Sequence, residues 1–176
     1  MDKKLIEKRL KKLNDETNQI FDELKSLSDE NIVKHGKGWS IVQVLNHLNM
    51  AESLSLNYMK KKVNAGKKMK KINVVNRLRI WITCGFLDTG LKWKAPKYIA
   101  NPPNQMTLKE QREAWEKTRL EIADYINQYP EELLDRAVYK HPMAGRLSLS
   151  QAINSFIFHQ RHHVYQIKRI RKELSI

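Results

Sequence analysis

The chain has 176 residues, a length that favours one domain over residues 1–176 with a core that needs no disulfide. Lysine and arginine outnumber aspartate and glutamate by 33 to 19, and the resulting net charge of +14 indicates an anionic partner without informing on the fold. The single cysteine, Cys84, excludes an internal disulfide, and the charged start and short apolar runs predict a cytoplasmic protein with no membrane span.

Four long helices are predicted in chain order, because apolar residues recur every three to four positions. They cover about residues 3–27, 40–63, 107–129 and 148–174. The last three begin with capping boxes, in which a hydroxyl and a side chain three residues later satisfy free backbone amides. The pairs are Ser40 with Gln43, Thr107 with Glu110, and Ser148 with Gln151.

The connections are less regular than the helices. Residues 28–39 are predicted to be a connection, and within 64–106 the segment Ile72–Leu87 predicts a short helix before a proline-rich loop. Residues 130–147 predict a further short helix and a loop. No alternating strand pattern appears, so the expected fold is all-α: a four-helix bundle with a longer loop and short-helix segment between its second and third long helices.

Three histidines lie in helical stripes that otherwise consist of apolar residues. His159 and His163 are four residues apart, which places both rings on one face of the last helix. His47 lies in the apolar stripe of the second long helix. If these two helices are neighbours, three imidazoles can bind one divalent metal and leave a coordination position open for a reacting group.

The alternative is that these histidines are buried core residues bonded to carbonyl groups, as a lone histidine in an apolar stripe usually is. The pair in one stripe and the third residue in another favour the metal site. His162 is expected at the edge of the site or on the surface, and His35 and His141 are expected in solvent-facing loops.

Two patches of sequence resemble the DinB-like superfamily of four-helix bundles. The first is Gly38-Trp39-Ser40 followed by Val44-Leu45-Asn46-His47-Leu48, and the second is His159-Gln160-Arg161-His162-His163-Val164-Tyr165-Gln166-Ile167. Both contain the family's pattern of a Trp-Ser helix start, an "HL" histidine and H-x-x-x-H-x-x-Q-I. The family's metal triad maps onto His47, His159 and His163.

The resemblance implies a divalent metal, foremost zinc or nickel, with iron and manganese as further candidates. It also implies a homodimer and an enzyme of the thiol S-transferase type, which would join a low-molecular-weight thiol to a small-molecule electrophile. Other relatives are metal-dependent hydrolases. Hydrolysis ranks second because Glu52, the one acid of the second long helix, lies about 140° around the helix from His47 and is expected to point away from it.

Basic residues are dense between positions 60 and 97, and residues 53–87 contain no acid. The last helix adds Lys168, Arg169, Arg171 and Lys172. The simplest interpretation is solvated surface. A second is an anionic-ligand site at a basic rim beside the metal pocket, and a third is a non-enzymatic module that binds nucleic acid or another polyanion. Nucleic acid ranks last, because stacking aromatics are few and no DNA-binding motif is present.

The apolar run Ile80–Leu87 has three interpretations: a lid over the pocket, a dimer contact or core packing, of which core packing is favoured. Cys84 within it is expected to be inert, because no histidine is close to it in sequence. Trp39 and Trp115 are expected in the core or an interface.

Overall fold

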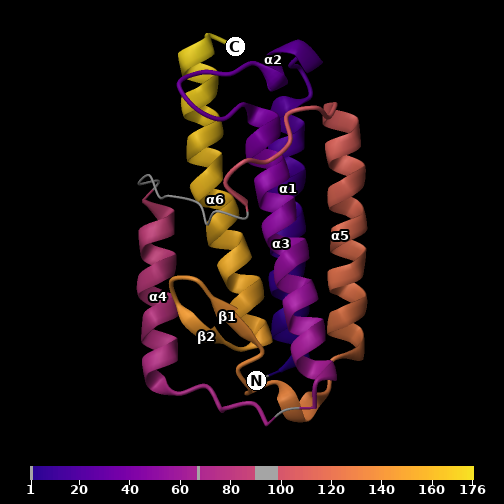
Figure 1. Ribbon diagram of the computed structural model, residues 1–176, viewed down its shortest axis with the longest axis vertical. Coiled ribbons are helices and arrows are strands. Elements are labelled where there is room, and N and C mark those ends of the chain that lie inside the picture. Colours follow the sequence, from indigo (N-terminus) through magenta and orange to yellow (C-terminus); the bar gives the residue numbers. More distant parts are fainter. Residues whose placement is uncertain (1, 67, 90–98) are drawn as a thin grey trace.

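The computed structural model describes residues 2–66, 68–89 and 99–176. It confirms the all-α bundle and its four long helices (Figure 1). These are α1 (Lys3–Leu24), α3 (Ile41–Asn64), α5 (Leu108–Gln128) and α6 (Leu149–Leu174). The smaller elements are α2 (Asp29–Val33), α4 (Val74–Asp88), the 3-10 helix η2 (Glu131–Leu133) and the strands β1 (Tyr139–His141) and β2 (Gly145–Leu147).

The helix starts follow the predicted local chemistry. All three capping boxes form, with the side chains of Ser40, Thr107 and Ser148 accepting hydrogen bonds from backbone amides three residues later. The short helix predicted in the middle of the chain is α4, which has a capping box of its own at Asn73. Local side-chain bonds therefore determine where these helices begin.

Four helices form a closed ring in which α1 packs on α5 and α6, and α3 packs on the same two helices. Figure 1 shows α1 and α6 running one way and α3 and α5 the other, so the contacting pairs α1–α6 and α3–α5 are parallel. Parallel neighbours require a long connection that returns the chain to the starting end. This is the reason for the long middle segment, whose helix α4 packs outside the ring against α6.

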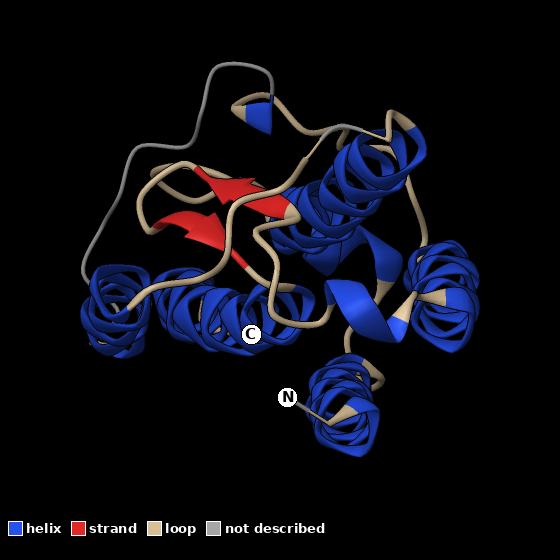
Figure 2. Cartoon of the chain, turned by 90° about the horizontal axis from the view of Figure 1, so that it is seen from below, coloured by secondary structure: helices blue, strands red, loops and turns tan. Residues whose placement is uncertain are grey.

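Residues 130–147 contain the predicted short helix as η2, but the predicted loop after it is wrong, because β1 and β2 form an antiparallel hairpin there. The hairpin contacts α3, α4 and α6, and Figure 2 shows it on the flank of the bundle. Gly145 begins β2 at φ +73°, a conformation that favours glycine. Strands of three residues are too short for an alternating pattern to be visible in the sequence.

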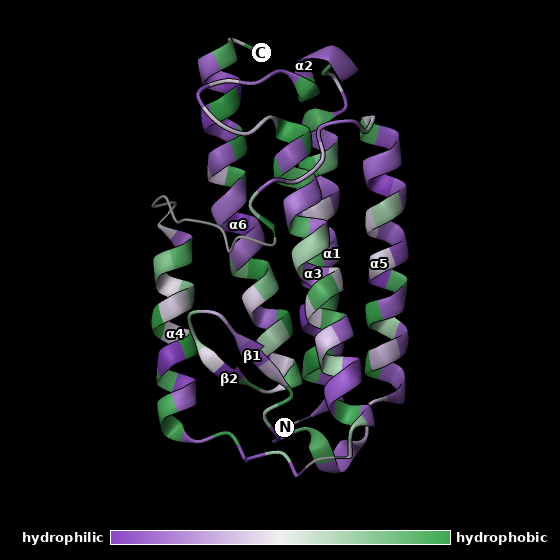
Figure 3. Cartoon of the chain, in the orientation of Figure 1, coloured by the Kyte–Doolittle hydropathy of each residue, from purple (hydrophilic) through white to green (hydrophobic). Residues whose placement is uncertain are grey.

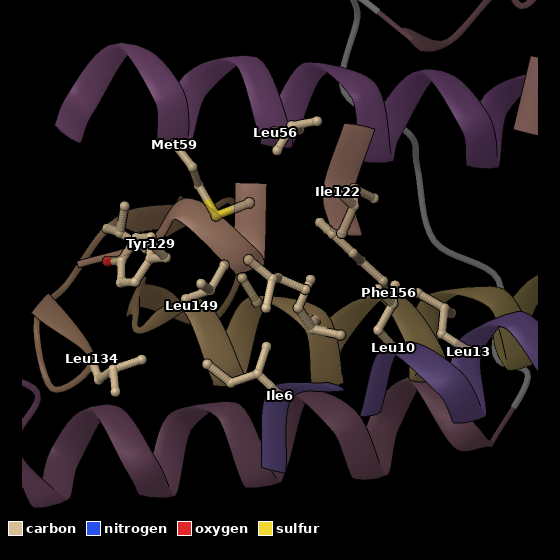
Figure 4. Packing of buried hydrophobic residues seen from close by; sticks show 14 of the residues in the cluster. Ile6, Leu10, Leu13, Leu56, Met59, Ile122, Tyr129, Leu134, Leu149 and Phe156 are labelled. Atoms are coloured by element: carbon tan, nitrogen blue, oxygen red, sulfur yellow. The ribbon is translucent and has the colours of Figure 1, made fainter. Parts of the chain in front are cut away.

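The core of the four-helix ring consists of two apolar clusters stacked along the bundle axis, and a third, smaller cluster lies between α4 and the hairpin. In the ring, one cluster lies around Leu13 and Leu56 (Figure 4), and the other around Leu45 and Trp115. A buried polar layer separates the two clusters, because each of the four long helices has a buried polar residue between its residues of one cluster and those of the other. This layer consists of Thr17, Glu52, Arg119 and Gln160.

Most residues of the predicted stripes are buried, and Figure 3 shows apolar and polar positions alternating around each helix. Leu120 on α5 is 68% exposed, because it lies about 140° around the helix from the buried Trp115. Leu54 and Tyr58 are also exposed, but they line a cavity. No helix in the described part of the chain has an apolar stretch long enough to cross a membrane.

Candidate metal centre

The structure brings together the three histidines that the sequence singled out, because α3 and α6 are neighbours in the ring. The Nε2 atom of His159 lies 3.3 Å from that of His47 and 3.1 Å from that of His163. One donor atom from each ring falls within 4.8 Å of both others. Three nitrogens from two helices therefore converge on one point.

Hydrogen bonds orient two of these rings. Nδ1 of His47 lies 3.1 Å from the carbonyl oxygen of Ile99, and Nδ1 of His163 lies 2.8 Å from Oε1 of Gln166. Because both partners are acceptors, each Nδ1 carries the proton and each Nε2 offers its lone pair to the centre. Such outer partners fix the tautomer of metal-binding histidines. The glutamine of the H-x-x-x-H-x-x-Q pattern thus has a physical role here.

Burial keeps the triad neutral. It lowers the pKa of His47, lowers that of His159 well below its usual value, and lowers that of His163 to about 3, and the neighbouring imidazoles add to the effect. Trp39 contributes to this burial, since its ring stacks on His163 and contacts His47. Neutral imidazole is the form that binds metal, so the site needs no deprotonation at pH 7.

The donor set fits a divalent cation. Metal–nitrogen bonds of about 2.0–2.1 Å in tetrahedral geometry hold their donor atoms about 3.3 Å apart. The Nε2 atom of His159 lies at close to this distance from the Nε2 atoms of His47 and His163. Nitrogen donors suit zinc, nickel, copper and iron, and no carboxylate belongs to the cluster among the described residues. Three protein ligands leave coordination positions open, the arrangement typical of catalytic rather than structural sites.

A cavity of about 740 Å³ borders the three rings. Its wall includes apolar and aromatic side chains from α3, the hairpin and α6, and its polar lining includes three cationic residues. The apolar group contains Leu54, Tyr58, Tyr139 and Phe156, and the cations are Lys37, Lys140 and Arg169. His159 is only partly buried, so the triad is accessible from this space.

One expectation about the other histidines is wrong. His141 is not solvent-facing: it lies in β1, lines the cavity, and burial lowers its pKa to about 4. Its Nδ1 accepts from the backbone amides of Met143 and Ala144, both at 3.1 Å, which places the ring proton on Nε2. No sequence signal could have found it, because its position depends on the hairpin.

His162 lies at the edge of the site, one of its two expected places, because it lines the cavity and its ring centroid is 5.0 Å from that of His163. It is buried rather than on the surface, and it stays outside the triad as expected. Its Nδ1 lies 3.3 Å from the carbonyl oxygen of Leu87, at the end of α4. The burial depends on α4, which covers a side of α6 that a four-helix ring alone would leave open. His35 is exposed, as expected.

Glu52 points away from the triad, as expected, and is buried in an ion pair with Arg119 at 3.0 Å. Burial raises the pKa of Glu52, and Arg119 opposes that shift. Cys84 is buried, and burial raises the pKa of its thiol to about 11, in agreement with the expected inertness. Trp115 is a core residue.

The basic tract of residues 60–97 supplies none of the cations that line the cavity among the described residues. Lys60 pairs with Glu121, and Lys71 pairs with Asp135, on the outside of the molecule. Four further lysines of the tract lie outside the described residues: Lys67, Lys92, Lys94 and Lys97.

Comparisons with known proteins agree with this geometry. The family model of the DinB superfamily matches residues 6–167. The chain is 24% identical to the uncharacterized protein YuaE of Bacillus subtilis, over 89% of this chain and 93% of that protein. Its fold is similar to that of YfiT from Bacillus subtilis, described as a probable metal-dependent hydrolase with an unusual four-helix bundle topology. That likeness has a TM-score of 0.59 at 14% identity and covers 99% of this chain and 90% of YfiT.

Proposed function

The chain belongs to the DinB superfamily, and from this membership and the converging imidazoles we propose that it is a metal-dependent enzyme of the thiol S-transferase type. The observation that carries the proposal is the approach of three Nε2 atoms, two of them held with their lone pairs inward. His47, His159 and His163 would hold a divalent metal, for which zinc and nickel are the first candidates. The bound metal would lower the pKa of a thiol or a water molecule, so that a nucleophile exists at neutral pH.

The protein's own residues would bind and orient the substrates. The apolar wall with Tyr58, Tyr139 and Phe156 suits the carbon skeleton of an electrophile, and it excludes water from one side of the site. The Nε2–H group of His141 would donate a hydrogen bond to substrate, because its tautomer is fixed by two backbone amides. Lys37, Lys140 and Arg169 would attract an anionic thiol or substrate to the cavity.

Thiol transfer is preferred to hydrolysis because of what surrounds the triad. Hydrolysis by a metal-bound water commonly uses a carboxylate as general base. Glu52 is unsuitable because it is paired with Arg119 in the bundle interior. Glu173 lines the cavity, but its Oε1 accepts a hydrogen bond from the backbone amide of Lys37 at 2.9 Å. A thiol needs no such base once its proton is lost on binding. Hydrolysis remains the second candidate, supported by the fold shared with YfiT, and polyanion binding without catalysis is the third.

The first experiment measures metal content by mass spectrometry after purification without a histidine tag. We expect about one divalent metal per wild-type chain and at least a tenfold lower content in His163→Ala. His35→Ala is the matched control, because it removes an exposed histidine outside the triad. Equal and negligible metal in wild type and His163→Ala would exclude both enzymatic candidates.

The second experiment separates thiol transfer from hydrolysis in the metal-loaded protein. Thiol-dependent consumption of a small electrophile, without cleavage of model esters or amides, is the result expected for a transferase. Cleavage that is independent of added thiol would assign the site to hydrolysis. A polyanion-binding module would show neither activity, and its association with polyanions would weaken steeply with salt.

A further inference from the structure

One face of α4 is apolar and turned away from the protein. The helix packs on α6 and β2 through Ile80, Thr83, Cys84 and Leu87, and its opposite side is exposed. The exposed apolar residues on that side are Val74 (79%), Val75 (54%), Leu78 (55%), Trp81 (74%), Ile82 (44%) and Phe86 (48%). At 100° per residue they fall within an arc of about 140° and form one continuous face. Core packing thus explains only half of the predicted apolar run.

Gly85 lies within this face, and the fold itself does not require a glycine there. A Cβ atom at Gly85 would meet nothing within 4 Å among the described residues. Glycine in a helix interior is less favourable than alanine. A second helix packed against the face would explain a glycine at position 85, because a residue without a side chain lets two helix backbones approach closely.

The charges at one edge of the face indicate which helix would fit. Arg77 and Asp88 lie near opposite ends of α4. They are eleven residues apart, which is within about 20° of three full helical turns, so both lie along the same edge of the face. Neither forms an ion pair with a described residue. A two-fold axis near Ile82 would set two antiparallel copies of α4 together and place each Arg77 beside the partner's Asp88.

The same axis places Trp81 of one copy beside the partner's Gly85. A bulky ring would thus face the one position without a side chain, and this would occur twice, as two-fold symmetry requires. An anionic membrane would also attract a basic amphipathic helix. It would gain nothing from Gly85, however, and would be repelled by Asp88.

We propose that the exposed face of α4 is the interface of a homodimer in which two antiparallel α4 helices pair through Trp81 and Gly85, with Arg77 bonded to the partner's Asp88. One helix pair of four turns is at the small end of specific interfaces, so we expect dissociation in the micromolar range. The proposal is independent of the metal site, because the triad lies on α3 and α6.

Sedimentation velocity between about 1 and 200 μM, at physiological salt, tests the proposal. We expect a concentration-dependent dimer for the wild type and a monomer for Trp81→Glu. Leu120→Glu is the matched control, because Leu120 is similarly exposed but lies on α5. A wild type that stays monomeric up to 200 μM, or a dimer that Trp81→Glu leaves unchanged, would overturn the proposal.

A charge exchange tests the orientation of the pair. Arg77→Asp and Asp88→Arg should each raise the dissociation constant about tenfold, and the double variant should restore dimerisation. Circular dichroism verifies that each variant is folded, which matters for Asp88→Arg because Asp88 acts electrostatically on Arg161. Failure of the double variant to recover, with all variants folded, would refute the antiparallel register. Trp81-dependent binding of a monomeric protein to anionic vesicles would assign the face to a membrane instead.

Discussion

The buried ion pair between Glu52 and Arg119 allows a quantitative prediction. Its side chains are 2% and 8% exposed, and Nη2 of Arg119 lies 3.0 Å from Oε1 of Glu52. The same guanidinium lies 3.2 Å from Oγ1 of Thr17 and 3.2 Å from Oδ1 of Asn14, so it links α1, α3 and α5. Glu52→Gln removes the negative charge and leaves the positive charge buried.

Loss of one partner from a buried ion pair costs about 3–5 kcal/mol, because the remaining charge stays desolvated. For a chain of this length, 1 kcal/mol corresponds to about 2–4 °C in melting temperature, so Glu52→Gln should lower it by about 6–20 °C. The double variant Glu52→Leu/Arg119→Leu should be more stable than Glu52→Gln, because replacing both charges by apolar groups removes the desolvation cost.

Urea unfolding of the metal-free protein, followed by circular dichroism, measures these differences without stabilisation by bound metal. Glu113→Gln is the control, since the Lys109–Glu113 pair is exposed and its loss should cost less than about 1 kcal/mol. If Glu52→Gln costs no more than Glu113→Gln, the view of this layer as a desolvated network is refuted. Metal content should be the same in Glu52→Gln as in the wild type, which separates the layer from the triad.

Two further predictions concern the cavity histidines. The metal-free protein should lose stability as the pH falls below 6.5, because unfolding lets His141 and His163, with folded pKa values of about 4 and about 3, take up protons. Urea unfolding between pH 7.5 and 4.5 should show that the free energy of unfolding falls by up to about 1.4 kcal/mol per pH unit for each ring. A free energy of unfolding that stays constant down to pH 5 would contradict this prediction. His141→Gln should lower kcat/KM at least tenfold with unchanged metal content, and full activity in this variant would leave His141 with a purely structural role.

The sequence predicted the long helices and their starts because these depend on local chemistry. Ser40, Thr107 and Ser148 bond amides three residues away, and no distant part of the chain is needed to recognise them. The triad was predictable for a related reason: helical periodicity alone puts His159 and His163 on one face. That His47 joins them required α3 and α6 to be neighbours, which the sequence allowed but did not determine.

The errors occur where position depends on contacts between distant segments. The hairpin strands are too short to have a pattern, so His141 was placed in a solvent-facing loop. His162 was expected at the edge of the site or on the surface, and the choice between the two depended on α4, which covers that side of α6.

Charge shows the same limit of local information most clearly. The density of basic residues suggested that residues 60–97 form a basic rim beside the metal pocket. The cations that line the cavity are instead Lys37, Lys140 and Arg169. Lys37 lies in the α2–α3 connection and Lys140 in the hairpin, whereas Arg169 belongs to the basic run of residues 168–172 in the last helix. An electrostatic field at a site sums over distances in space rather than along the chain. Substitution of these three residues, rather than of the basic tract, should therefore change how an anionic substrate reaches the triad.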